Sequence, residues 1–509
     1  MRRARLCETG HSRFFMPSPS SIFSRELVRL TFAILSIVAV VAFEGISVSG
    51  ALPEVVAELG DAHLLPWTIT GFLVSSGIST VVTGGLIDAY GALRIFRYAT
   101  FAFAIASLLC GLAPTMPWLI AARVLQGSAG GSMTSVAIGA VVMAYPPHLT
   151  GRAMAANSNV WAILGAGGPA LAAFLLPLGG FRAIFFSMIP LAMAALWAGY
   201  DALPDAHDAR RTAVDWTSLA LLSTGLAALL LAISNFGLHS LLLLVAGAAL
   251  LVHVVRRSQD DPDALIEARF VSRAPFAQLT GCTFLTLAAT VGVETYLPIY
   301  VRGARRGSIS LAAWSMFWLT IGWTLGANVA GRILGRVRPE QVLIAATSLG
   351  PPAIALAGWL IHTDGELPWL FACYALMGLV IGMTLVSALQ LVKQLAPEKS
   401  MGKATSSHAF TRTLGFSVGA GLAGGVILGW ARLSLADASA VQGALSGAHG
   451  ALSLGPGQAL SQGFALAHLT GFVLMLLAFG SALHLWRGLA HERAKSQARQ
   501  TQPSTPERQ

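Results

Sequence analysis

Charged residues are scarce in this chain, and their scarcity decides its broad class. Of the 509 residues, 11% are charged and 55% are hydrophobic, and the mean hydropathy is +0.68. A soluble globular protein carries about 25% charged residues, so soluble enzymes and DNA-binding proteins are strongly disfavoured. The net charge of +10 does not indicate a nucleic-acid partner, because the basic residues are spread over short loops rather than gathered on one face.

Cysteine is also rare, and the few cysteines follow no pattern. Of the 4 cysteines, Cys110, Cys282 and Cys373 lie in apolar runs and Cys7 lies in the basic N-terminal segment. We therefore expect no disulfide framework. The sequence also has no metal-ligand spacing, no nucleophile elbow and no phosphate-binding loop, so we expect no metal, no cofactor and no enzymatic activity.

Long apolar runs, in contrast, fill most of the chain. The first extends from about Leu30 to Gly50, and its length of about 20 residues is what a helix needs to cross a bilayer. It is longer than the apolar core of a signal peptide and no small-residue cleavage site follows it, so we expect it to be retained. Fourteen such runs predict membrane-spanning helices, over about residues 30–50, 66–87, 95–113, 118 onward, 157–178, 181–203, 216–236, 241–255, 276–301, 311–334, 342–361, 367–391, 410–428 and 465–485.

The helices divide into groups of six, two and six. Charged linkers at 204–215 and 256–273 enclose two helices with almost no polar residues, which suits a lipid-facing scaffold. We therefore predict an all-α polytopic membrane protein with two six-helix bundles and an inserted two-helix hairpin. Duplicated bundles are typical of transporters, whose substrate site lies between the halves. The predicted parts are a disordered tail 1–26, a bundle 27–203, the linkers and hairpin 204–273, a bundle 274–487 and a disordered tail 488–509.

The basic residues predict the orientation. Most of the 33 lysines and arginines fall in the two tails and in the loops on the same side as the tails. The positive-inside rule then places both termini in the cytoplasm, so we expect a multi-pass protein of the plasma or inner membrane. Arg302, Arg305 and Arg306 break the rule locally, and they form either an external binding patch or an ordinary solvated loop.

Two acids lie inside apolar runs. Glu44 is the sole ionisable residue between Leu30 and Gly50, and it must face protein or water because lipid does not solvate a carboxylate. Burial favours the neutral form, so this group is suited to taking up and releasing a proton; the alternative is an acid that only ties helices together. Glu294 lies in the first helix of the second half, where it either faces a cavity and binds a cation or proton, or lies near the outer interface.

Several motifs in the first half and one in the second give the chain a family resemblance. With these motifs the chain resembles the fourteen-helix drug:proton antiporter branch of the major facilitator superfamily. The matching stretches are Glu44 with Ala51-Leu52-Pro53, Gly84 to Gly91, Arg123 to Gly127, Gly165 to Pro169, Gly180 to Phe186 and Arg412 to Gly415. The chain departs from the family pattern at Glu44, where Asp is usual, at Ala92 and Leu93, where basic residues are usual, and at Ala172-Ala173, where Gly-Gly is common.

The resemblance implies two groups of functional residues. Glu44, Arg123 and Gln126 would couple transport to protons, with Arg123 biasing the acid while Gln126 shares its helix face; the alternative for Arg123 is an interfacial arginine that snorkels outward. Asp88, Gly91 and Arg94 would form a cytoplasmic gate, with Gly91 permitting the tight turn. The alternative for Asp88 is an ordinary solvated loop charge.

Two further sets complete the predicted site. The fifth-helix antiporter motif contains Gly165, Gly168 and Pro169, which allow a kink or close helix approach, although plain packing would explain any one of them. The predicted substrate cavity combines the acids Glu44 and Glu294 with Trp318 and Trp323. These aromatic side chains can bind organic cations, or they belong to an interfacial belt.

Together these features predict a secondary active transporter that exports small hydrophobic or cationic compounds in exchange for protons. Its expected partners are the lipid bilayer, a small-molecule substrate and protons, and we expect a monomer. A dedicated metabolite exporter or a proton-coupled importer on the same fold is the nearest alternative. A non-transporting sensor or a membrane enzyme is less favoured, because the chain shows neither a sizeable soluble region nor a reactive group of side chains.

Overall fold

The computed structural model describes residues 21–203, 216–234, 238–258, 269–334, 336–397, 401–435 and 455–501. Throughout these ranges the regular structure is helical, without a strand. Among these described residues, ten helical spans are long and apolar enough to cross a membrane. The predicted all-α membrane architecture is therefore confirmed.

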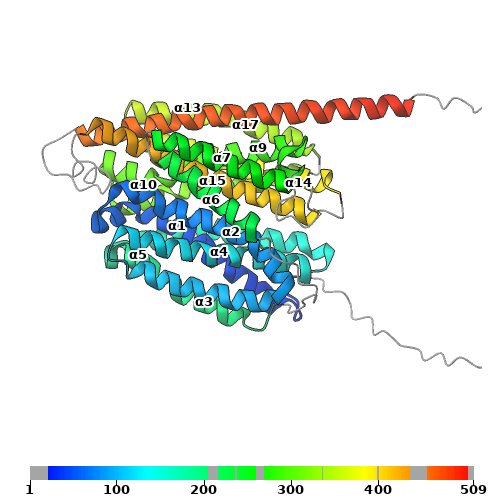
Figure 1. Ribbon diagram of the computed structural model, residues 1–509, viewed down its shortest axis with the longest axis horizontal. Helices are drawn as coiled ribbons and strands as arrows, with labels where there is room; N and C mark the ends of the chain where they lie inside the picture. Colours follow the sequence, from blue (N-terminus) through cyan, green and yellow to red (C-terminus); the bar gives the residue numbers. More distant parts are fainter. Residues whose placement is uncertain are drawn as a thin grey trace, which may run out of the picture.

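The first half of the chain forms the lower group of helices in Figure 1. Its elements are α1 (Val28–Leu59), η1 (Ala62–Leu64), α2 (Leu65–Tyr90), α3 (Ala92–Gly111), α4 (Met116–Ala144) and α5 (Pro147–Gly199). The backbone of α5 leaves helical geometry at Gly179 and Gly180, where Gly180 has a φ of 59°. Since this positive φ favours glycine, the bend divides α5 into the two helices that the sequence predicts.

The remaining helices form the hairpin and the upper group in Figure 1. They are α6 (Trp216–Ser234), α7 (Leu238–Arg257), α8 (Arg269–Ser272), α9 (Phe276–Thr295), α10 (Leu297–Ile299), the π-helix η2 (Tyr300–Ala304), α11 (Ile309–Ser315), α12 (Phe317–Ile333), α13 (Pro339–His362), α14 (Leu367–Leu395), α15 (Met401–Ser434) and α17 (Gly455–Thr501). The run from α9 to η2 corresponds to one predicted helix, and α11 with α12 corresponds to another.

Helix starts follow simple local chemistry. Helices α2, α4, α5, α13 and α14 each carry a proline in the first turn, where its missing N–H costs nothing and its fixed φ suits the helix. The turn between α2 and α3 is made by Gly91 with a φ of 85°, which confirms that this position needs a glycine. Pro53 lies inside α1, so the first helix continues past the predicted end near Gly50.

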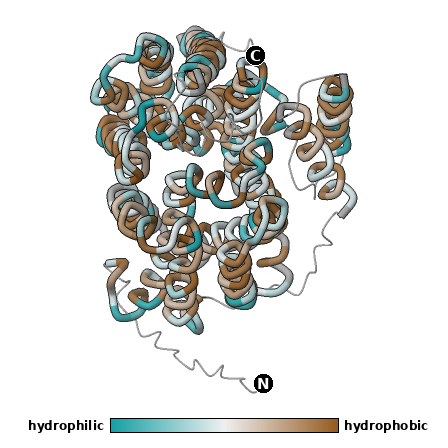
Figure 2. Tube along the Cα trace, turned by 90° about the vertical axis from the view of Figure 1, so that its left-hand side faces the viewer, coloured by the Kyte–Doolittle hydropathy of each residue, from teal (hydrophilic) through white to brown (hydrophobic). Residues whose placement is uncertain are grey.

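The two groups repeat one packing pattern. In the first, α4 packs against α2 and α3, and in the second, α14 packs against α12 and α13. Between the groups, α1 contacts α10 and α11, α5 contacts α11 and α12, and α2 contacts α15. The hairpin of α6 and α7 lies to one side, as Figure 2 shows, and α6 reaches the main body at α2 and α15. The functional side chains are therefore held on a duplicated scaffold.

The structure shifts several predicted boundaries. The tail 488–509 was predicted to be disordered, yet α17 continues to Thr501, because Leu489 is buried and Arg493 pairs with Glu340 of α13. At the other end Ile22 is buried against the core, so ordered structure begins before the predicted boundary at 27. Hydropathy marks only the apolar part of a helix, whereas these helices extend into water. The described part excludes residues 1–20, the linker 204–215, the middle of the second linker at 259–268, and the ranges 235–237, 335, 398–400, 436–454 and 502–509.

Candidate functional site

Glu44 lies inside the first group of helices, away from lipid. Glu44 is 1% exposed, and its Oε1 atom pairs with Nη1 of Arg123 at 2.5 Å. The two side chains come from α1 and α4, and the pair is buried on both sides because Arg123 is only 2% exposed. The prediction of a protein-facing acid is confirmed, and the snorkelling alternative for Arg123 is wrong.

Arg123 connects three helices through its guanidinium group. Besides Glu44, Nη1 donates to Oε1 of Gln126 at 2.5 Å, and Nε donates to the backbone oxygen of Thr68 in α2 at 3.0 Å. The guanidinium carbon also lies 4.2 Å from the centre of the Phe72 ring, within the range of a cation–π contact. Arginine does not lose its proton in a protein, so this arrangement provides a fixed positive charge beside the acid.

Gln126 fixes the position of that charge. Its Nε2 atom donates to Oγ of Ser107 in α3 at 2.8 Å, which directs its Oε1 atom toward Arg123. The thiol of Cys110 lies 3.7 Å from the same Oε1 atom. Gln126 is fully buried, so its amide has little freedom to rotate. The predicted trio of Glu44, Arg123 and Gln126 is thus a single buried cluster, and α1, α2, α3 and α4 all contribute to it.

Two buried polar atoms on α1, one of them in this cluster, have no hydrogen-bond partner among the described residues. They are Oε2 of Glu44 and Oγ of Ser47. Residues three apart on a helix lie on the same face, so Glu44 and Ser47 share a face of α1. A carboxylate oxygen with a free lone pair is where a proton can add without displacing an existing hydrogen bond. The cluster therefore has one oxygen committed to Arg123 and one available for protonation.

Glu294 is the second buried acid, on α9. It is 5% exposed, so the alternative of a wet position at the outer interface is wrong. Among the described residues it forms no hydrogen bond or ion pair, in contrast to Glu44. Another polar pair lies in the same group of helices, where the hydroxyl of Tyr374 in α14 is 3.0 Å from Nε2 of His468 in α17. Glu294 is thus a buried acid in the second group of helices.

The four residues of the predicted substrate cavity each have surroundings of their own. Trp318 is 37% exposed and stacks on Phe371 of α14, whereas Trp323 is half-buried and stacks on Phe416 of α15. No hydrogen bond, ion pair or ring contact joins Glu44, Glu294 and these two described tryptophans to one another. The combined cavity therefore remains a prediction.

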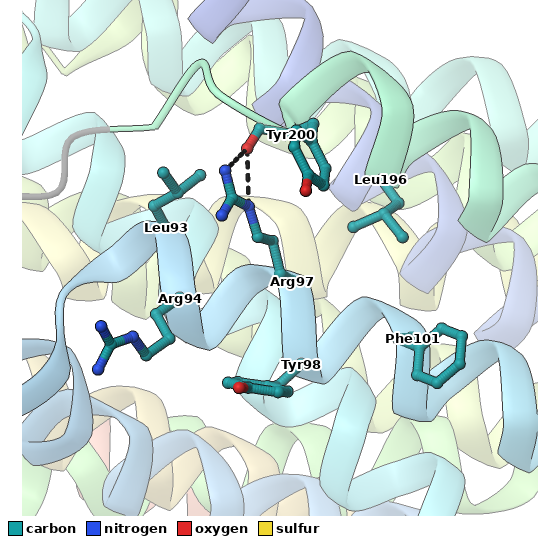
Figure 3. A pocket seen from close by; sticks show the side chains of 7 residues that line it. All are labelled: Leu93, Arg94, Arg97, Tyr98, Phe101, Leu196 and Tyr200. Atoms are coloured by element: carbon teal, nitrogen blue, oxygen red, sulfur yellow. Dashed lines mark hydrogen bonds between the residues drawn. The ribbon is translucent and has the colours of Figure 1, made fainter.

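The predicted gate residues lie at the turn between α2 and α3. Gly91 is buried and forms that turn, but the side chain of Asp88 lies outside the described part of the structure. Arg94 is exposed on α3 and lines a surface groove with Arg97, as Figure 3 shows. The gate itself is not tested by these positions and stays a prediction.

The fifth-helix motif lies at a contact between the two groups. Gly165, Gly168 and Pro169 are all buried in α5. A Cβ atom at Gly165 would lie 2.2 Å from Cγ2 of Thr320 in α12, so only glycine permits this approach. At Gly167, two residues along, a Cβ atom would meet nothing within 4 Å. The motif therefore supplies close packing between the halves.

The polar contacts near the C-terminal end of α1 are not among the predictions from sequence. Arg302 of η2 lies 3.9 Å from Glu54 of α1, which joins the two groups, and Arg182 pairs with Glu58. Nη1 of Arg305 also donates to the backbone oxygen of Gly365 at 2.8 Å, so Arg302 and Arg305 are both held by contacts within the fold. The position of Glu54, directly after the Ala-Leu-Pro stretch, was the available signal.

Comparisons with known proteins agree with this architecture. The family model described as Major Facilitator Superfamily matches residues 33–420. The chain is 27% identical over 413 residues to a probable actinorhodin transporter of Streptomyces coelicolor, across 76% of this chain and 70% of that protein. It is 24% identical over 437 residues to Multidrug resistance protein 3 of Bacillus subtilis, across 83% of each. A solved bacterial homologue of the human lysosomal transporter Spinster shares the fold, with 16% identity, a TM-score of 0.62 and coverage of 90% and 96% of the two chains.

Proposed function

This chain belongs to the Major Facilitator Superfamily, and we propose that it exports small hydrophobic or cationic compounds in exchange for protons. The family makes it a multi-pass membrane transporter rather than an enzyme. Multidrug resistance and efflux proteins among its relatives support export of foreign compounds. The proton-coupled step is our inference from the buried cluster.

One observation carries the proposal: Glu44 binds Arg123 through one carboxylate oxygen while its other oxygen is buried without a partner among the described residues. A proton that adds to Oε2 removes the negative charge and leaves Arg123 with its contacts to Gln126 and Thr68. The charge–charge attraction between α1 and α4 is then lost, because Glu44 is neutral. Arg123 keeps its own charge and is left without a negative partner. Protonation thus changes how α1 is held against its neighbours.

The size of this effect suits a conformational switch. Two unit charges about 4 Å apart attract by about 4 kcal/mol at an effective dielectric constant of about 20. Moving a two-state equilibrium from 1:99 to 99:1 takes about 5.5 kcal/mol. Neutralising Glu44 alone is therefore a large share of the required energy, and substrate binding supplies the remainder. In the proposed cycle, protonation from outside releases substrate, and deprotonation to the cytoplasm restores the anionic site.

The substrate class follows from the second acid. Glu294 is a buried carboxyl group without a cationic partner among the described residues, so a positively charged substrate group would supply the missing counter-charge. The stacked pairs of Trp323 with Phe416 and Trp318 with Phe371 would offer apolar and cation–π contacts.

We place both termini in the cytoplasm, on the distribution of basic residues.

A dedicated metabolite exporter is the second candidate. It is favoured by the match to a probable actinorhodin transporter, at 27% identity. The two candidates differ in substrate range, because a dedicated exporter would protect a deletion strain against one compound class alone. A susceptibility screen combined with analysis of exported metabolites in that strain separates them.

The experiment for proton coupling uses the full chain in proteoliposomes with an imposed pH gradient. Wild type should move substrate against its concentration gradient, and the pH of the vesicle lumen should change in proportion to the amount of substrate moved. Glu44→Gln should lose both signals, whereas Glu492→Gln, which changes an exposed acid on α17, should keep them. Gradient-driven transport by Glu44→Gln at the wild-type rate would falsify the proposal.

A further inference from the structure

A groove of about 420 Å³ lies on the outer surface between the start of α3 and the end of α5. Figure 3 shows its polar lining, which consists of Arg94 and Arg97 with the rings of Tyr98 and Tyr200. Phe101 continues the lining along α3 toward the middle of the helix. Arg94 is also a residue of the predicted cytoplasmic gate, whereas no function assigned above uses the other residues of the groove.

Arg97 is held in the groove with part of its guanidinium group unused. Its Nε and Nη2 atoms donate to the backbone oxygen of Tyr200 at 2.8 and 2.5 Å, and its guanidinium carbon lies 4.1 Å from the centre of the Tyr200 ring. A guanidinium group has five N–H donors, so its Nη1 side remains available. A fixed arginine with free donors is suited to a phosphate oxygen.

The charge of the groove is not balanced by the nearby acids that the structure describes. Arg94 is exposed and forms no hydrogen bond or ion pair with another described residue. Asp201 follows Tyr200 in sequence, but it is bound to Arg29 of α1 at 2.7 Å, so its charge is already matched. The side chain of Asp88 lies outside the described residues. Two arginine charges therefore remain to attract an anion.

The position of the groove along α3 and its exposed aromatic residues indicate a place near the lipid headgroups. Arg97 is the sixth residue of α3, about 8 Å along the axis at 1.5 Å per residue. Large aromatic side chains on both helices are exposed, since Tyr98 of α3 is 71% exposed and Trp197 of α5, next to Leu196 in sequence, is 84% exposed. Tyrosine and tryptophan collect at the boundary between headgroups and acyl chains. The arginines thus suit the headgroup of a lipid molecule, and the aromatic rings suit the boundary between its headgroup and its acyl chains.

We propose that this groove binds an anionic phospholipid through its headgroup phosphate. Arg94 and the free side of Arg97 contact the phosphate oxygens, and the acyl chains lie along Tyr98 and Phe101. Basic pockets on the cytoplasmic side of membrane proteins are suited to anionic headgroups, and the lysine and arginine distribution places this end of α3 on that side. Apolar walls that open to the bilayer favour a lipid over a soluble phosphate.

Native mass spectrometry of the full chain in detergent tests this site. The protein is titrated with short-chain phosphatidylglycerol, with phosphatidylcholine of the same chain length, and with inorganic phosphate. Each arginine near an anionic headgroup contributes about fivefold in affinity, so Arg94→Gln should weaken phosphatidylglycerol binding about fivefold and Arg94→Gln/Arg97→Gln about thirtyfold. The matched control is Arg336→Gln/Arg487→Gln, which removes two exposed arginines elsewhere and should bind as wild type does.

Three results would overturn the assignment. Unchanged phosphatidylglycerol binding in the groove variants would show that the lipid binds elsewhere, and equal loss in the control would show attraction to overall charge. Equal binding of inorganic phosphate and phosphatidylglycerol would make the groove a soluble-anion site. Arg94→Gln keeps the test valid if the double variant fails to fold, because Arg94 forms no hydrogen bond or ion pair with another described residue.

Discussion

The buried pair of Glu44 and Arg123 allows structural and proton-coupling roles to be separated by a double-mutant cycle. Each of Glu44→Gln and Arg123→Gln leaves one charge buried without its partner. Breaking a buried pair in this way costs about 3–5 kcal/mol, which agrees with the attraction of about 4 kcal/mol expected at an effective dielectric constant of about 20. Glu44→Gln alone is therefore expected to weaken the fold.

The variant with both changes, Glu44→Gln/Arg123→Gln, should recover about half of that loss. With both charges removed, the remaining cost is that of the hydrogen bonds from Arg123 to Thr68 and Gln126. At about 1 kcal/mol each, these place the double variant about 2 kcal/mol below wild type. Reversible unfolding in mixed micelles, followed by tryptophan fluorescence, gives the free energy of unfolding for all four proteins.

Transport then decides the function of the acid. The double variant is expected to be folded, and yet it should show no proton movement with substrate in proteoliposomes, because the group that carries the proton is absent. Proton movement at the wild-type ratio in this folded variant would refute the coupling role of Glu44 and leave a purely structural ion pair. Single variants that each cost less than about 1 kcal/mol would instead refute the buried-pair energetics.

Three other predictions follow from single contacts. Gly165→Ala should lower the transport rate severalfold, because its Cβ would lie 2.2 Å from Cγ2 of Thr320. Adding Thr320→Ser, which removes that methyl group, should restore the rate. Gly167→Ala, whose Cβ would meet nothing within 4 Å, should match wild type in the same assay. Glu294→Gln should leave the free energy of unfolding within about 1 kcal/mol, while it lowers uptake of cationic but not neutral substrates. Arg493→Gln should lower the free energy of unfolding by about 2 kcal/mol, because it leaves a buried carboxylate on α13 without its donor.

The fold could be predicted from sequence because two strong signals agree. Apolar runs of bilayer length must form helices, since lipid offers no partner to backbone polar groups, and prolines and Gly91 mark where helices begin and turn. Helix ends could not be predicted in the same way. The continuation of α17 to Thr501 depends on Leu489 and on the pairing of Arg493 with Glu340, and neither contact leaves a local pattern in the sequence.

The candidate site was predictable in part. A lone acid in an apolar run predicts a protein-facing carboxyl group, and the spacing of Arg123 and Gln126 predicts a shared helix face; both are seen in the structure. The roles of Thr68 and Ser107 could not be predicted, because a backbone oxygen and a serine at helix contacts carry no signature of their own. The grouping of Trp318 and Trp323 with the acids is likewise a question of tertiary packing, which periodicity does not address.

A buried ion pair is weak evidence for stability, because well-packed apolar residues can replace it at little cost. The functional importance of this ion pair comes instead from the other contacts that α1 makes. The helix that carries Glu44 also contacts α10, which begins at Leu297, three residues after Glu294. On the proposed mechanism, loss of charge at Glu44 loosens α1 from α4, and the same helix contacts the segment next to the second acid. Proton uptake in one half and substrate binding in the other are then linked through one helix contact, so that neither acid alone should support coupled transport.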